Sequence, residues 1–173
     1  QWLNHGAPLS SPKTLAREIN EKVSELEAWL NGDSNEMQLS ARYIYEHLFT
    51  SHLYFEDISE KDKTPQFFNL VRSRTPPGQA LDIIATRRTF DDPEVDRVYY
   101  RLQPVFSTIV SKTHQAYAIN EPLLDKWRLW FIDTEFSVET LPSYKPDVAA
   151  NPLTAFTLLP VESRYRFMLE RAQ

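Results

Sequence analysis

Cysteine is absent from this chain of 173 residues, and glycine occurs only three times. The lack of cysteine excludes disulfide bonds, thiolate metal sites, a cysteine nucleophile and thioether attachment of haem to these residues. The scarcity of glycine argues against glycine-rich phosphate-binding loops, and no Gly-x-Ser-x-Gly sequence is present for serine catalysis. No apolar run is long enough to span a bilayer. The net charge of −5 does not indicate a nucleic-acid partner, so any anion site must be local.

Hydrophobic residues make up 42% of the sequence and aromatic residues 13%, which is enough to bury a sizeable core. We expect residues 1–173 to form a single compact domain or a fragment of a larger enzyme. The chain starts without methionine and stops within a helical pattern, which favours the fragment. The patterns divide it into a helical hairpin (1–55), an antiparallel sheet (66–118) and a helical part (119–173), which together predict an α+β fold.

Two helical patterns occupy the first 50 residues. A hydroxyl N-cap and a proline at Ser10-Ser11-Pro12 predict the start of the first helix. Its apolar face consists of Leu15, Ile19, Val23, Leu26 and Leu30. Asn31-Gly32 ends this helix, and Asp33 with Glu36 predicts a capping box for the next one. Because few residues join the two helices, we expect an antiparallel hairpin.

Four runs after residue 65 are rich in β-branched and aromatic residues. We expect these strands to be Phe67–Ser73, Ala80–Arg87, Arg97–Pro104 and Thr108–Ala118. A Thr-Pro-Pro-Gly turn separates the first two, and the very short connection between the last two favours a tight hairpin. Short connections require antiparallel pairing, so the sequence predicts a small antiparallel sheet of about four strands. The charged stretch Glu56–Pro65 is expected to be a loop.

The last third of the chain carries three predicted helix starts, at Asn120, Asn151 and Pro160. This region is also rich in aromatic residues. The aromatic candidates for a lipid groove are Trp127, Trp130 and Phe131, together with Tyr99 and Tyr100 of the predicted sheet. The structural alternative, which we favour, places these side chains in the core.

Arginines in the predicted sheet are the first candidate for a functional site. Because side chains alternate along a strand, Arg72 and Arg74 share one face, while Arg87 and Arg88 end the second strand. Converging guanidinium groups bind a carboxylate or phosphate through paired hydrogen bonds. The sequence therefore predicts a site for an anion or a lipid headgroup. In the structural alternative, acidic residues of the same region neutralise these arginines.

Histidines are the second candidate. His114 is the candidate catalytic residue, because imidazole titrates near neutral pH and can act as an acid, a base or a haem-facing group. In the structural alternative it is a strand histidine satisfied by local hydrogen bonds. His47 and His52 are five residues apart, so they do not share a helix face, and no metal site is predicted.

Several blocks of the sequence resemble successive blocks of the bacterial fatty acid cis/trans isomerases. The blocks are Leu30–Ser34, Ala41–Phe49, His52–Phe55, Val71–Gly78, Ile83–Arg88, Val98–Arg101, Ile109–His114, Leu141–Tyr144 and Arg164–Met168. They follow one another over most of the chain, which makes the resemblance far more specific than a short motif.

The resemblance implies a periplasmic enzyme that converts cis double bonds in the acyl chains of membrane phospholipids to trans, as a response to solvents or heat. It also implies a c-type haem attached through Cys-x-x-Cys-His, which withdraws electrons so that the double bond can rotate. This chain lacks that motif, so we expect an interior fragment that holds no cofactor and is inactive alone. The expected partners are phospholipid acyl chains and the remaining segments of the same polypeptide, with no nucleic acid.

Two other functions stay open. A non-catalytic interaction domain would expose a large apolar surface patch. A small-anion-binding module would hold sulfate or phosphate among Arg72, Arg74, Arg87 and Arg101. A deep pocket lined by His114 and the arginines would favour a chemical role instead.

Overall fold

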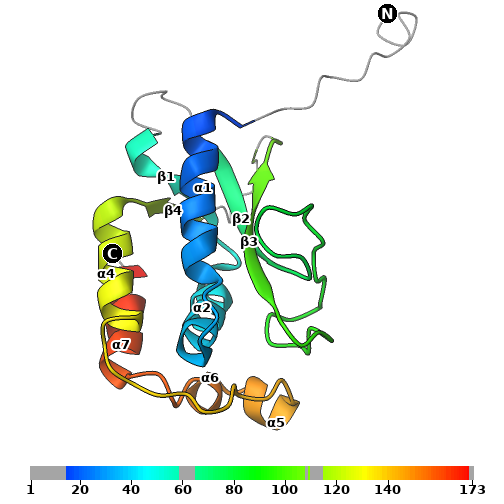
Figure 1. Ribbon diagram of the computed structural model, residues 1–173, viewed down its shortest axis with the longest axis vertical. Helices are drawn as coiled ribbons and strands as arrows, with labels where there is room; N and C mark the ends of the chain where they lie inside the picture. The colour runs from blue at the N-terminus through cyan, green and yellow to red at the C-terminus, as the bar shows by residue number, and fades with distance from the viewer. Residues whose placement is uncertain (1–14, 59–64, 108, 110–114, 172–173) are drawn as a thin grey trace, which may run out of the picture.

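The computed structural model describes residues 15–58, 65–107, 109 and 115–171 (Figure 1). Its elements in chain order are α1 (Arg17–Leu30), α2 (Asn35–Leu48), β1 (His52–Phe55), β2 (Phe67–Ser73), β3 (Tyr99–Val105), β4 (Ala116–Ile119), α4 (Glu121–Phe131), α5 (Pro146–Ala149), α6 (Pro152–Ala155) and α7 (Val161–Arg171). A helical pair, a four-stranded sheet and C-terminal helices confirm the predicted α+β class. Within the described residues, none of the helices combines the length and the apolar character needed to cross a bilayer.

The strand order is β3-β2-β1-β4, and the sheet is mixed rather than wholly antiparallel. β2 pairs antiparallel with both β1 and β3, whereas β1 and β4 pair parallel. The expected tight hairpin between the last two strands is wrong, because β3 and β4 lie at opposite edges of the sheet. The cause is β1, which follows α2 after only a short turn and provides the pairing edge for β4.

The predicted strand Ala80–Arg87 is also wrong. This segment forms a loop with a single bridge, between Ser73 and Ile83. Two backbone hydrogen bonds hold the loop against the end of β2: the N–H of Arg74 donates to the Asp82 carbonyl (2.9 Å), and that of Ile84 donates to the Arg72 carbonyl (2.8 Å). The predicted strand Thr108–Ala118 overlaps β4, but residues 110–114, which include the candidate His114, lie outside the described residues.

The N-terminal helices agree with the prediction in their central residues and differ from it at their ends. Leu26 and Leu30 of α1 are buried, as the helical spacing predicts, whereas the predicted start at Ser10 lies outside the described residues. The N-cap of α2 is Ser34, whose hydroxyl accepts the Met37 N–H (3.2 Å), so the predicted capping box at Asp33 is wrong by one residue. Glu36 instead accepts the N–H of Val138 (2.8 Å) in the segment after α4.

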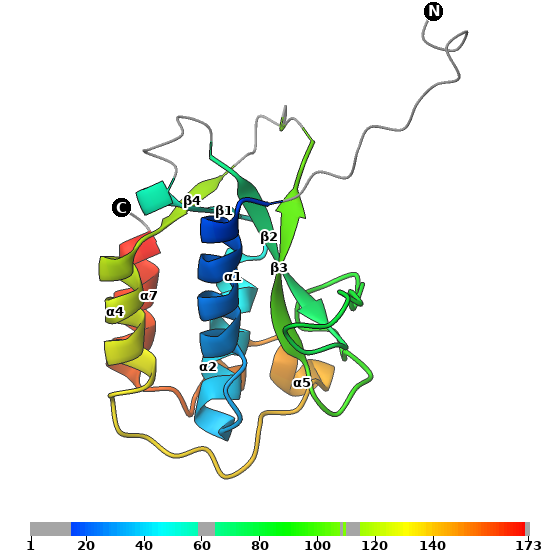
Figure 2. The same cartoon turned by 45° about the horizontal axis from the view of Figure 1, so that its top comes forward.

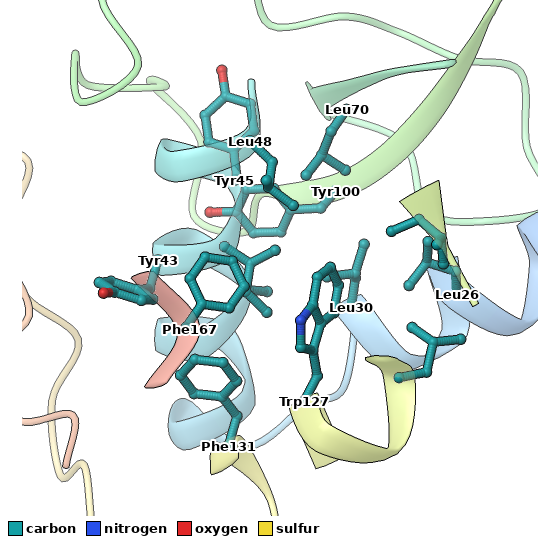
Figure 3. Packing of buried hydrophobic residues seen from close by; sticks show 14 of the residues in the cluster. Leu26, Leu30, Tyr43, Tyr45, Leu48, Leu70, Tyr100, Trp127, Phe131 and Phe167 are labelled. Carbon is teal, nitrogen blue, oxygen red and sulfur yellow. The ribbon is translucent and has the colours of Figure 1, made fainter. Parts of the chain in front are cut away.

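The core extends from the helices to the sheet, and it contains an aromatic cluster shared by α2, α4 and α7 (Figure 3). Phe167 of α7 lies 5.6 Å from the ring of Trp127, 5.8 Å from that of Phe131 and 5.6 Å from that of Tyr43, measured between ring centroids. The aromatic residues of α4 are therefore core, and the structure places them in no lipid groove. α4 and α7 lie side by side on the opposite side of the molecule from the loop between β2 and β3 (Figures 1 and 2).

Candidate functional site: a cleft bordered by arginines

A cleft of about 410 Å³ opens beside the end of β2. Its lining residues come from α2 and the turn after it (Tyr45, Phe49, Thr50), from β1 (His52), from β2 (Asn69–Arg72) and from the loop Ile83–Thr89. The structure thus brings Arg72, Arg87 and Arg88 of the predicted set to one cleft, although not through the strand pairing that the sequence suggested. The convergence depends on the loop after the Pro-Pro-Gly turn, which folds back onto the end of β2.

Arg72 forms the inner wall of the cleft and is only 1% exposed. Alternation along β2 turns its side chain inward, toward Tyr45 of α2, whose ring centroid lies 5.6 Å from the guanidinium carbon. One terminal nitrogen donates to the Asp91 carbonyl (2.9 Å) and the other to the Thr86 hydroxyl. Arg72 is therefore enclosed, and it holds the loop that carries Arg87 and Arg88.

Arg88 and Arg87 are both exposed, but their surroundings differ. The Arg88 Nε lies 2.7 Å from one carboxylate oxygen of Asp91, and the other oxygen accepts the Arg88 backbone N–H (2.9 Å). These contacts, the backbone hydrogen bond first, hold the pKa of Asp91 below its ordinary value. Arg87 has no hydrogen bond or ion pair with any described residue, and it lines the same cleft. Arg87 is thus a cation at this rim that a ligand can reach without breaking a pair between described residues.

The other arginines of the prediction lie elsewhere. Arg74 is exposed outside the cleft and pairs with Asp82 (3.4 Å). Arg101 pairs with Glu27 (2.7 Å) and donates to the carbonyl of Pro76 (2.8 Å), so its guanidinium supports the fold. Three of the four arginines in the predicted anion site therefore line the cleft, and the binding of an anion there stays a prediction.

Of the two described histidines, one supports the fold and the other lines the cleft. His47 contacts the Tyr43 carbonyl through Nδ1 (2.7 Å) and packs on the rings of Tyr43 and Phe167, which is a structural arrangement. His52, at the first position of β1, lines the cleft. Sequence reasoning missed this role because β1 itself was not recognised. Across the described part of the chain, no three histidine, aspartate or glutamate residues gather into a metal-binding group.

A buried ion pair lies on α2, outside the lining of the cleft. Arg42 Nε is 2.9 Å from a Glu46 oxygen, and both side chains are at least nine-tenths buried. The Arg42 guanidinium also donates to the Pro142 carbonyl (3.0 Å) and stacks on the Tyr144 ring at 3.9 Å. Burial raises the pKa of Glu46, and the hydrogen bond from Arg42 opposes that rise. Arg42 thus joins the segment after α4 to α2.

Comparison with known families gives one match. The family model for fatty acid cis/trans isomerase matches residues 1–173, which is the whole chain. The comparison with curated proteins and the comparison with solved structures each gave no match.

Proposed function

Because the chain belongs to the fatty acid cis/trans isomerase family, we propose that it is part of an enzyme that converts cis double bonds of phospholipid acyl chains to trans. The observation that carries this proposal is the match over the full length of the chain. We extend the proposal to a periplasmic enzyme whose remaining segments supply the reactive group, so that this part is inactive alone.

The residues present do not fit covalent attachment of a c-type haem, because thioether linkage needs cysteines and the chain has none. We therefore propose that any haem of the complete enzyme is held by residues outside this chain. The contribution of these residues is to bind and orient part of the substrate.

The cleft supports such a binding role. Its volume of about 410 Å³ lies in the usual range for ligand pockets. Apolar side chains of Phe49, Leu70 and Ile83 line it together with Arg87 at the rim. An anionic oxygen group can bind the guanidinium of Arg87 while an adjoining apolar portion contacts the inner wall. A phospholipid phosphate has this combination of groups, and so does a haem propionate.

The complete enzyme carrying Arg87→Ala tests the role of the cleft. A charged hydrogen bond contributes about 1.5–3 kcal/mol, so we expect isomerisation at subsaturating lipid to fall roughly 10- to 100-fold. The measurement is the trans-to-cis ratio of acyl chains by gas chromatography of their methyl esters. Arg74→Ala is the matched control, because it removes an exposed arginine outside the cleft. Equal activity of the two variants would show that the cleft does not contribute to isomerisation.

The second candidate function is a non-catalytic anion-binding domain, and the observation that favours it is Arg87, which pairs with no described residue. Calorimetric titration of this chain separates the anion sources. Inorganic phosphate and short-chain phosphatidylglycerol test for a lipid phosphate, while protoporphyrin IX and its dimethyl ester test for a propionate. Binding of the free-acid porphyrin alone would point to haem, and binding of none of these probes would refute an anion site.

A further inference from the structure

The two edges of the sheet are built differently. The edge strand β3 carries Arg101 and Pro104, and Arg101 is fixed by Glu27 and by backbone carbonyls of the adjoining loop. Charged residues and proline are the usual means by which proteins block pairing at a sheet edge. The edge strand β4 has the sequence Ala-Tyr-Ala-Ile, with neither a charge nor a proline. Neither a charge nor a proline therefore blocks pairing at the edge formed by β4.

The backbone of β4 presents hydrogen-bonding groups away from the sheet. The parallel register pairs His52 with Ala116, and the His52 N–H donates to the Gln115 carbonyl (2.8 Å). In a parallel ladder a residue bonds to the two neighbours of its partner, so His52 bonds to Gln115 and Tyr117. The N–H and C=O of Ala116, and by the same alternation those of Ala118, point to the outer edge. In the described part of the chain, no strand lies beyond β4.

A groove runs beside this edge and leaves room for another strand. It has a volume of about 390 Å³ and is lined by Ala116, Tyr117 and Ala118 of β4 and by residues of α4. The Lys126–Glu170 ion pair (2.8 Å), which joins α4 to α7, lies in the same wall. The two alanines allow a neighbouring backbone to approach closely, because their side chains are small.

From this edge we infer that β4 pairs antiparallel with β4 of a second copy of the chain, so that one sheet continues through both molecules. A two-fold axis beside Tyr117 places Ala116 of each copy opposite Ala118 of the other. Each such pair exchanges two backbone hydrogen bonds, so the pattern is complementary to itself. The absence of charge in β4 means that two copies meet at this edge without like charges opposite each other.

Sedimentation velocity of the chain over a wide concentration range tests this inference. Ala116→Pro removes an outward N–H that does not bond to β1. Because both copies carry the substitution, the dimer loses two hydrogen bonds. We expect the dissociation constant of the dimer to rise at least about tenfold. Ala116→Lys, which places a charge on the edge, is expected to have a similar effect. Leu153→Lys is the matched control, because it adds the same charge at an exposed position of α6, far from β4 (Figure 1).

Amide hydrogen exchange identifies the interface independently. On raising the concentration, exchange at Ala116 and Ala118 is expected to slow, while exchange at Tyr117, whose N–H bonds to β1, stays constant. A chain that is monomeric at every concentration would overturn the inference. A dimer that forms without slower exchange at these two amides would also overturn the inference. So would a dimer that is weakened equally by Ala116→Lys and by Leu153→Lys.

Discussion

Glu27 of α1 and Arg101 of β3 form a buried ion pair, with Arg101 Nε 2.7 Å from one carboxylate oxygen of Glu27. The other oxygen accepts the backbone N–H of Leu102 at 2.7 Å. One carboxylate thus binds a side chain and the main chain of the same strand. This contact joins the first helix to the sheet over a sequence separation of more than seventy residues.

Removing the charge at this position is expected to destabilise the fold strongly. Glu27→Gln leaves the guanidinium of Arg101 buried without its counter-ion, which costs about 3–5 kcal/mol in the free energy of unfolding. Urea denaturation measures this change. Glu21→Gln removes an exposed partner of Arg17 on the same helix and should change the free energy by less than about 0.5 kcal/mol. Similar losses in both variants would contradict the structural role of the buried pair.

The cap of α2 gives a second prediction. Ser34→Ala removes the hydroxyl that accepts the Met37 N–H, so we expect a loss of about 1 kcal/mol in the free energy of unfolding. Asp33→Ala, one residue earlier, removes no cap and should have a clearly smaller effect. Thermal or urea unfolding of the two variants compares them directly, and a larger loss for Asp33→Ala would place the cap where sequence reasoning put it.

Alkaline pH should weaken the fold through Tyr43. Burial raises the pKa of this phenol to about 12, and its hydroxyl donates to the Arg164 carbonyl (3.1 Å). Between about pH 10 and 12 the unfolded chain releases a proton that the folded chain keeps, so the free energy of unfolding falls as the pH rises. Tyr43→Phe is expected to make this decline shallower. Comparison of the free energies of unfolding of the two proteins at pH 7 gives the effect of the lost hydrogen bond alone. If the free energy of unfolding fell equally steeply in both above about pH 10, the prediction would be refuted.

Helical spacing was the most reliable signal in the sequence. Leu26 and Leu30 recur at a spacing that places them on one face of a helix, and both are buried in the core. The alternating run Phe67–Ser73 likewise became β2 with its predicted limits. Both patterns succeed because a repeating face can be buried whatever its partner is.

Other elements depend on partners that are distant in the sequence. The run Ala80–Arg87 contains β-branched residues, yet its single bridge joins Ile83 to Ser73 at the end of β2. β3 pairs along the whole of β2, and β1 already occupies the other side of β2 at Phe68 and Asn69. β1 itself is four residues long and follows a helix closely, so no local period marks it. The candidate cleft has the same origin, since it arises only where the loop of Arg87 folds over the end of β2 beside α2.

The sequence by itself determined the α+β class, the apolar faces of the first helices, the absence of cysteine-based chemistry and the isomerase family. Tertiary structure alone decided the strand order, the separation of Arg74 from the cleft, the burial of Arg72 and the exposure of Arg87. The physical reason is the distance along the sequence over which each interaction acts. Periodicity and turn chemistry act between near neighbours, whereas strand pairing and the burial of charge depend on which distant segments exclude water from each other.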